Sequence, residues 1–420
     1  MRRHVVLASS AALLALSACG SSSGNPDGGG GPDGGLTRSF TPPFTPNSQQ
    51  IDKSIRVTFS GETFGVDGLP YPGNCNGGPD ALFFVDGWSV SFDEYIVVVD
   101  NIRLNSTAGN VIQTDVGSLV ASSKGGPWIL DMHNPSGFVG ADGEEPAGAL
   151  YLFTGPDSGG SFDPAVKYAF SYDVVQAKAG VVNVNLTDAQ VSTDLPLMIS
   201  KGWSKLVKGK AVFAGTDGYP GGDPAIDAKF KAFPKTIYFQ FGWDDHDSAI
   251  NCNNPNFNLA EDDPAGRGVQ VTPTGAVFAQ VTLHTDHIFW DQLIIHGTPL
   301  HFDQLAAWAT AANSSQATPL EIDQLGKPLA ATFSDGTPLP DRGPVEPTAS
   351  CYDSSFQPNP AQLTFHLSGS AGSVPSTVVK NLADFMAFSG QSQMHLNADG
   401  LCYNTGQHAS DPFYVPGLPK

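Results

Sequence analysis

The chain has 420 residues and a formal net charge of −20 at pH 7, while only 15% of its residues are charged. So acidic a protein is poorly suited to bind nucleic acid, or anionic lipid through a basic face, and we exclude both kinds of contact. The length is sufficient for one large domain or two ordinary domains with a substantial core.

The first residues have the features of an export signal. Arg2 and Arg3 precede an apolar stretch at 5–16 that is too short for a stable membrane span. The motif LSACG follows at 16–20 and resembles the bacterial lipobox, in which the cysteine becomes the lipidated N-terminus. We therefore expect residues 1–18 to be a lipoprotein signal peptide and Cys19 to carry a covalent lipid. The alternative is an ordinary secretory signal with a chance cysteine.

The lipid would place the protein in the bacterial cell envelope, at the outer membrane, on its periplasmic or surface face. Residues 21–35 read SSSGNPDGGGGPDGG, a composition with almost no side chains to bury. We expect 19–50 to be a flexible, lipid-anchored linker and 51–420 to be the folded body.

Four cysteines remain besides Cys19, and an oxidising compartment favours two disulfides among them. Three connectivities are possible. We favour Cys75 with Cys252, because both lie in polar, asparagine-rich loops, and Cys351 with Cys402. A zinc–thiolate site is disfavoured because no two of these cysteines are closely spaced.

Abundant glycine and proline with period-two alternation of apolar residues predict a mainly β protein. The expected architecture is a β-sandwich, jelly-roll-like or immunoglobulin-like, with a short helical insertion at 286–312. A helix at 286–296 would be followed by a second at 298–312, and a third is expected at 375–388. The expected strands are 54–59, 88–92, 95–99, 128–130, 149–153, 168–172, 181–186, 210–214, 236–241, 277–283 and 363–367.

Two segments carry resemblances to known proteins. The first resemblance is to large lipoproteins of myxobacteria and their relatives, for which no activity is known. It rests on DGWSVSFDEY at 86–95 with NIRL at 101–104, and on HTDH at 284–287. The first segment also distantly resembles MbnP-like copper-associated periplasmic proteins, which are β-sandwiches. That second resemblance covers one strand pair, so it implies no site residues here.

Histidines gather in one segment, 284–303 (HTDHIFWDQLIIHGTPLHFD), which holds four of the ten in the chain. Imidazole binds zinc and copper, and carboxylates either ligate the metal or orient the ring. We predict a transition-metal site with His284, His287 and His301 as ligands and Asp286 as a ligand or orienting group.

Each of these residues also has a structural interpretation. Asp286 could be a helix N-cap, and the histidines could form a polar cluster without a metal. Met394 and His395 could add soft donor character, although we expect His395 chiefly to pack beside Cys402. Nitrogen and oxygen ligands favour Zn(II) or Cu(II).

The predicted function is therefore metal binding by a membrane-anchored lipoprotein. A non-enzymatic envelope module that binds a protein or glycan is the alternative, and a metallohydrolase ranks last, because recognisable catalytic motifs such as GxSxG, HExxH or a Walker A loop are missing from the sequence.

Overall fold

The computed structural model describes residues 35–42, 51–71, 84–108, 116–140, 148–244, 246–259, 263–290, 300–325, 331–342, 363, 368–369, 372–373, 381–391 and 393–406. Within these ranges the fold is mainly β, with two mixed sheets and few helices, as expected for a β-sandwich. None of the helices in the described part of the chain is both long and apolar enough to span a membrane. Cys19, Cys75 and Cys351 lie outside the described residues.

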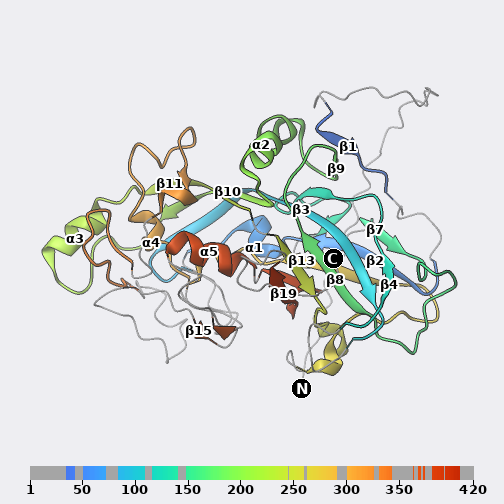
Figure 1. Cartoon of the computed structure of the whole chain (residues 1–420). Coiled ribbons are helices and arrows are strands. Elements are labelled where there is room, and N and C mark those ends of the chain that lie inside the picture. Colours follow the sequence, from blue (N-terminus) through green and yellow to red (C-terminus); the bar gives the residue numbers. More distant parts are fainter. Residues whose placement is uncertain are drawn as a thin grey trace, which may run out of the picture.

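The larger sheet is built around one long strand, β3 (Trp88–Asn105), which pairs with β10, β5, β8 and β4. Figure 1 shows this strand crossing the middle of the molecule. The described strands of this sheet are β1 (Thr37–Ser39), β3, β4 (Leu119–Ser122), β5 (Trp128–Asp131), β8 (Ala169–Val174), β9 (Val181–Asn183), β10 (Lys205–Phe213), β11 (Thr236–Trp243), β12 (Asp247–Ile250), β14 (Leu320–Glu321) and β19 (Tyr403–Gly406).

The smaller sheet has the order β18-β17-β13-β2-β6, and β7 also pairs with β2. Its central pair is parallel, which aligns the carboxyl ends of β2 and β13 at one edge. The bounds are β2 (Ser54–Ser60), β6 (Val139–Gly140), β7 (Tyr151–Phe153), β13 (Ala276–Leu283), β17 (Met394–Leu396) and β18 (Gly400–Leu401). A separate pair joins β15 (Ser368–Gly369) to β16 (Gly372–Ser373).

Both faces of β3 are covered at its centre, which explains the continuous apolar run at 95–99. Val97 and Val99 point into the core that the two sheets share, where they join Val57 and Phe59 of β2. The alternate residues Ile96 and Val98 pack in a second cluster with α2 (Asp188–Lys201). The shared core therefore makes the two sheets one sandwich, with α2 covering its outer face.

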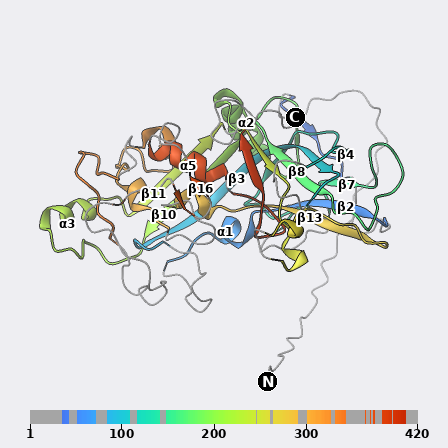
Figure 2. The same cartoon turned by 60° about the horizontal axis from the view of Figure 1, so that its bottom comes forward.

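Helix α2 is well capped although the sequence analysis did not predict it. Thr187 accepts from the backbone of Gln190, whose side chain accepts in return from the backbone of Thr187, and Gly202 ends the helix at φ 71°. The other described helices are α1 (Glu62–Asp67), α3 (Pro224–Lys231), α4 (Asp303–Ala306) and α5 (Leu382–Gln391), with 3-10 helices η2 (Pro255–Phe257), η3 (Pro264–Gly266), η4 (Asp286–Phe289) and η5 (Ile322–Gln324). Figures 1 and 2 both place α3 at one end of the molecule and β2 and β7 toward the other.

Most predicted strands are present, and the two expected at 88–92 and 95–99 are one continuous strand, β3. The helical predictions were less accurate. The segment expected to be a helix from 286 is the short η4, because the backbone turns extended at Trp290 (ψ 154°), and residues 291–299 lie outside the described part. Within the second predicted helix, at 298–312, only α4 is α-helical among the described residues. The third helix was predicted to begin at 375, whereas α5 begins at Leu382. The strand expected at 363–367 lies almost wholly outside the described residues.

The folded body also begins earlier than predicted. Residues Thr37–Ser39, expected in the linker, form β1 and pair in parallel with β9. Arg38 fastens this strand by donating to the carbonyl oxygens of Gly125, Gly126 and Gly180. A flexible linker would therefore have to end before Thr37.

Candidate metal centre

The candidate site lies where three strands of the smaller sheet bring their residues together. In the parallel pair, Ser60 of β2 is opposite Thr282 of β13, so Glu62 and His284 leave the sheet at the same edge. In the antiparallel pair, His395 of β17 is opposite Thr282. Because side chains alternate along a strand, His395, Thr282 and His284 are on the same face. The register of the sheet therefore places two histidines and one glutamate together.

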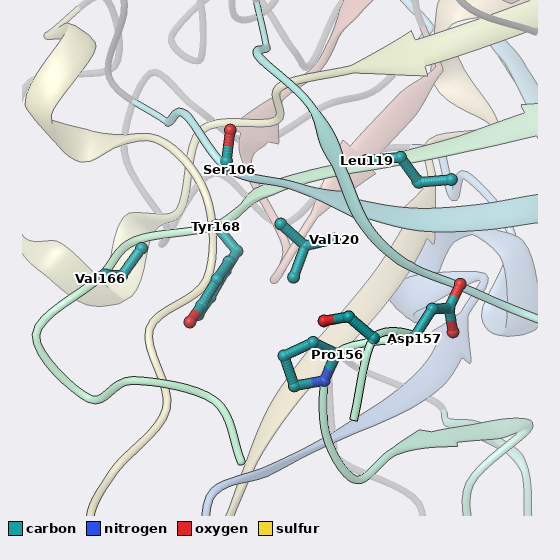
Figure 3. Close-up of a pocket in the computed structure, with 8 residues that line it drawn as sticks. Ser106, Leu119, Val120, Pro156, Asp157, Val166 and Tyr168 are labelled. Carbon is teal, nitrogen blue, oxygen red and sulfur yellow. The ribbon is translucent and has the colours of Figure 1, made fainter. Parts of the chain in front are cut away.

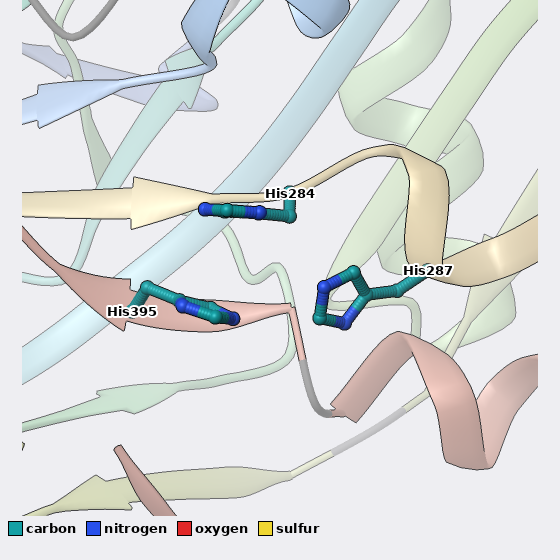
Figure 4. A group of neighbouring side chains, drawn as sticks. All are labelled: His284, His287 and His395. Atoms are coloured by element: carbon teal, nitrogen blue, oxygen red, sulfur yellow. The ribbon is translucent and has the colours of Figure 1, made fainter. Parts of the chain in front are cut away.

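Three imidazole rings meet at this edge (Figure 4). Nitrogen atoms of His284, His287 and His395 all lie within 4.8 Å of one another. His284 and His395 stack with ring centroids 4.0 Å apart, and His287 meets each of them edge to face at 5.4 and 5.3 Å. His287 and His395 are buried, while the side chain of His284 retains 11% of its exposure. Three ring nitrogens at this spacing are a donor set that one metal ion can bridge.

The short helix η4 supplies His287 and Asp286. His287 stacks on the indole of Trp290, with ring centroids 3.7 Å apart. The Nε1–H of Trp290 donates to Oδ2 of Asp286 at 3.1 Å, and the buried Oδ1 of Asp286 has no hydrogen-bond partner among the described residues. That oxygen is 3.9 Å from Nδ1 of His284. Trp290 thus holds Oδ2 of Asp286, and Oδ1 of the same carboxylate lies on the side of His284.

Two further oxygens approach the other nitrogen of His284. Its Nε2 is 3.3 Å from the carbonyl oxygen of Ala398 and 3.4 Å from Oε2 of Glu62. Burial raises the pKa of Glu62 above its usual value, an effect that His284 opposes and the carboxylates of Asp399 and Asp286 reinforce. Burial likewise raises the pKa of Asp286, and His284 opposes the shift. A cation at this edge would stabilise both carboxylates in their charged form.

His301 does not join these histidines, contrary to the prediction. Its Nε2 is 3.4 Å from Oδ1 of Asp341. Its backbone N–H donates to the carbonyl oxygen of Phe289 in η4. The group that could hold a metal, within the described residues, consists of His284, His287 and His395. The chain instead leads His301 into a separate buried cluster.

That separate cluster contains three carboxylates and one guanidinium. Asp86 accepts the backbone N–H groups of Phe302 and Asp303, each at 2.7 Å, and Arg342 forms a two-point ion pair with Asp303. Burial raises the pKa of Asp86 to about 7, with the carboxylate of Asp303 adding to the shift and His301 and Arg342 opposing it. The third carboxylate is Asp341. This network accounts for His301 without a metal.

His395 was expected chiefly to pack beside Cys402, yet it is one of the three histidines that could hold a metal. It is indeed buried near that cysteine, but its ring faces the other two histidines. The sequence around His395, MHL at 394–396, does not by itself indicate a metal ligand. His395 comes close to the other two histidines only because β17 pairs with β13.

The disulfide pairing also differs from the favoured one. Cys252 is joined to Cys402, so the expected pairs Cys75–Cys252 and Cys351–Cys402 are wrong. Cys252 follows β12 and Cys402 precedes β19, and these two strands pair antiparallel. The register brings the two cysteines side by side, which similarity between polar loops could not reveal. The link fastens the β17–β18 hairpin, and with it His395, to the larger sheet.

A pocket of about 480 Å³ lies elsewhere, on the larger sheet (Figure 3). Its walls are mostly apolar, and its one carboxylate, Asp157, already accepts hydrogen bonds from Ser122. It contains none of the candidate ligands. The lining residues are Ser106, Leu119, Val120, Pro156, Asp157, Ser158, Val166 and Tyr168.

Comparison of the chain with known protein families, with curated proteins and with solved structures gave no significant match.

Proposed function

We propose that this protein binds one divalent transition-metal ion, zinc or copper, through His284, His287 and His395, with Asp286 as a further ligand or an orienting group. The observation that supports the proposal is the meeting of three imidazoles from two strands and a 3-10 helix within 4.8 Å. His301, a ligand in the sequence-based hypothesis, is replaced by His395.

The energetics of burial favour a bound ion. Imidazole nitrogens and a carboxylate lose their hydration when they are buried, and this loss is costly unless partners replace the water. The open Oδ1 of Asp286 beside His284 is such a group. A metal ion would give this oxygen a charged partner. Three nitrogens and one oxygen suit Zn(II) or Cu(II) by donor chemistry.

Burial also favours binding over hydrolysis. His287, His395 and Asp286 are each at most 4% exposed, which leaves little room for a substrate beside a metal. A hydrolytic metal needs an open coordination position with room for a substrate, and the burial of these side chains disfavours one here.

The location of the protein is proposed from the sequence alone. Lipid on Cys19 would hold the body to the bacterial outer membrane by a flexible tether. An envelope protein or glycan remains an alternative partner, and it requires no metal.

Elemental analysis of the full chain, purified without a polyhistidine tag and without added metal, tests the proposal. We expect about one equivalent of zinc or copper, as for a single structural site. His284→Ala with His287→Ala should abolish it, whereas the control His301→Asn should retain it. Absence of metal, together with an unchanged melting temperature on adding either ion, would refute the proposal.

A further inference from the structure

We infer that Glu62 is a positioning residue of the metal site, and that its carboxylate, with that of Asp286, makes the site select a divalent cation over Cu(I). This inference rests on the proposed function. It is carried by the backbone of Glu62, by the hydrogen bonding of His284 and by the charge of the site.

The backbone is strained at two residues that contact the same ring nitrogen. Glu62 (φ 55°) and Ala398 (φ 67°) both adopt the left-handed region, which side chains other than asparagine, aspartate and glycine rarely occupy. Such backbone strain is unfavourable and is concentrated at functional sites. Both residues approach Nε2 of His284, at 3.4 Å through Oε2 of Glu62 and at 3.3 Å through the carbonyl oxygen of Ala398. The two residues with unfavourable backbone conformations therefore supply two oxygens within 3.4 Å of Nε2 of His284.

The oxygens behind the ring determine which nitrogen is available to a metal. A carbonyl oxygen only accepts, so the contact with Ala398 requires that Nε2 of His284 carries the proton. The lone pair is then on Nδ1, the nitrogen that lies 3.9 Å from the open Oδ1 of Asp286. A carboxylate or carbonyl behind a ligating histidine fixes its tautomer and makes it a stronger donor. Glu62 is in this position.

The charge of the assembled site then favours one class of cation. Three neutral imidazoles and the carboxylates of Asp286 and Glu62 carry two negative charges, and both acids are largely buried: their side chains are 2% and 15% exposed. A divalent ion makes this group neutral, whereas Cu(I) leaves one negative charge uncompensated. Burying unbalanced charge is costly, so Zn(II) and Cu(II) are preferred.

The test compares Glu62→Gln with the unmodified chain and with Asp399→Asn. Asp399 is exposed and close enough to influence Glu62, so its replacement removes the same charge without removing the contact to His284. The affinities of the full chain for Cu(II) and Cu(I) are measured with competing chelators. For E62Q we expect the ratio of Cu(II) to Cu(I) affinity to fall about tenfold, a rise of about 59 mV in the one-electron potential. For D399N we expect little change.

An unchanged ratio in E62Q, or equal shifts in E62Q and D399N, would overturn the inference while leaving metal binding intact. If the unmodified chain binds neither ion, the proposed function itself fails. Should E62Q fold poorly, Glu62→Gly replaces it, because glycine tolerates the positive φ at this position, and the same fall in the ratio is expected.

A second measurement needs no metal. Nitrogen chemical shifts of the histidine rings in the metal-free full chain report which ring nitrogen carries the proton. We expect His284 to be protonated on Nε2. Protonation of His284 on Nδ1 would overturn the assignment of Glu62 as its positioning residue.

Discussion

His284 and His395 stack with their imidazole planes 16° apart, although one follows β13 and the other lies in β17. The antiparallel register of these strands sets the two rings on one face, so the contact depends on sheet pairing and not on any local motif.

We expect His395→Asn to weaken binding of Zn(II) or Cu(II) by more than the roughly 10- to 100-fold that is typical of changes behind the ligands. His301→Asn should leave the affinity unchanged, because His301 contacts Asp341 instead. Chelator competition on both variants checks this. A larger loss for His301→Asn than for His395→Asn would contradict the structure and restore the ligand set predicted from the sequence.

Trp290→Phe should keep the stacking on His287 but remove the N–H that holds Asp286. Because Asp286 is then free to turn away, we expect metal affinity to fall roughly tenfold. Chelator competition measures the affinity, and tryptophan fluorescence tests the location, since Cu(II) bound beside Trp290 should quench its emission. Quenching of equal amplitude in the unmodified and W290F chains would show that copper binds elsewhere.

Cys252→Ala with Cys402→Ala should lower the free energy of unfolding by about 2–5 kcal/mol, because the disulfide closes a long loop of 150 residues. Metal affinity should also fall, since the link anchors the hairpin that carries His395. Urea unfolding and metal titration on the same preparation separate the two effects. Lost stability with full affinity would mean that the β17–β13 pairing alone holds the ligand.

Asp86 should make stability depend on pH. Its pKa is raised from 3.8 to about 7 in the folded chain, so between these values the folded state binds more protons than the unfolded state. The free energy of unfolding should therefore fall as pH rises through this window and level off above it.

Asp86→Asn keeps an oxygen to accept from Phe302 and Asp303 but cannot ionise. We expect this variant to have a shallower slope, with Glu94, whose pKa burial also raises to about 7, supplying part of what is left. It should exceed the unmodified chain in stability at pH 8, by an amount on the order of a few kcal/mol at most. Unfolding by urea at pH 5 and pH 8 measures it. Parallel pH profiles for the two proteins would refute the role of Asp86.

The alternation of apolar residues predicted most of the strands, because a strand with one buried face needs an apolar side chain at every second position. Helix α2 was not predicted, although Thr187 and Gln190 form a capping box, and it tolerates Pro196 in its interior, where proline is usually unfavourable. The helix predicted from Asp286 failed for a tertiary reason: Trp290 leaves the helical conformation and stacks on His287.

For the site, the sequence was sufficient only where ligands are neighbours along the chain. His284 and His287 lie three residues apart in the sequence, and their ring nitrogens lie within 4.8 Å of one another, with Asp286 beside His284. Glu62 and His395 depend on the register of β2, β13 and β17, and nothing in either segment specifies that register. The same limit explains the wrong cysteine pairing.

The pairing of β13 with both β2 and β17 joins residues that are made at very different times during synthesis. Glu62 is made early, but the ribosome must add more than three hundred further residues before His395 exists. A nascent chain therefore holds an incomplete ligand set for nearly all of its synthesis. Under the proposed function, metal would therefore load after β17 has been made, and products that stop before β17 would bind the ion weakly.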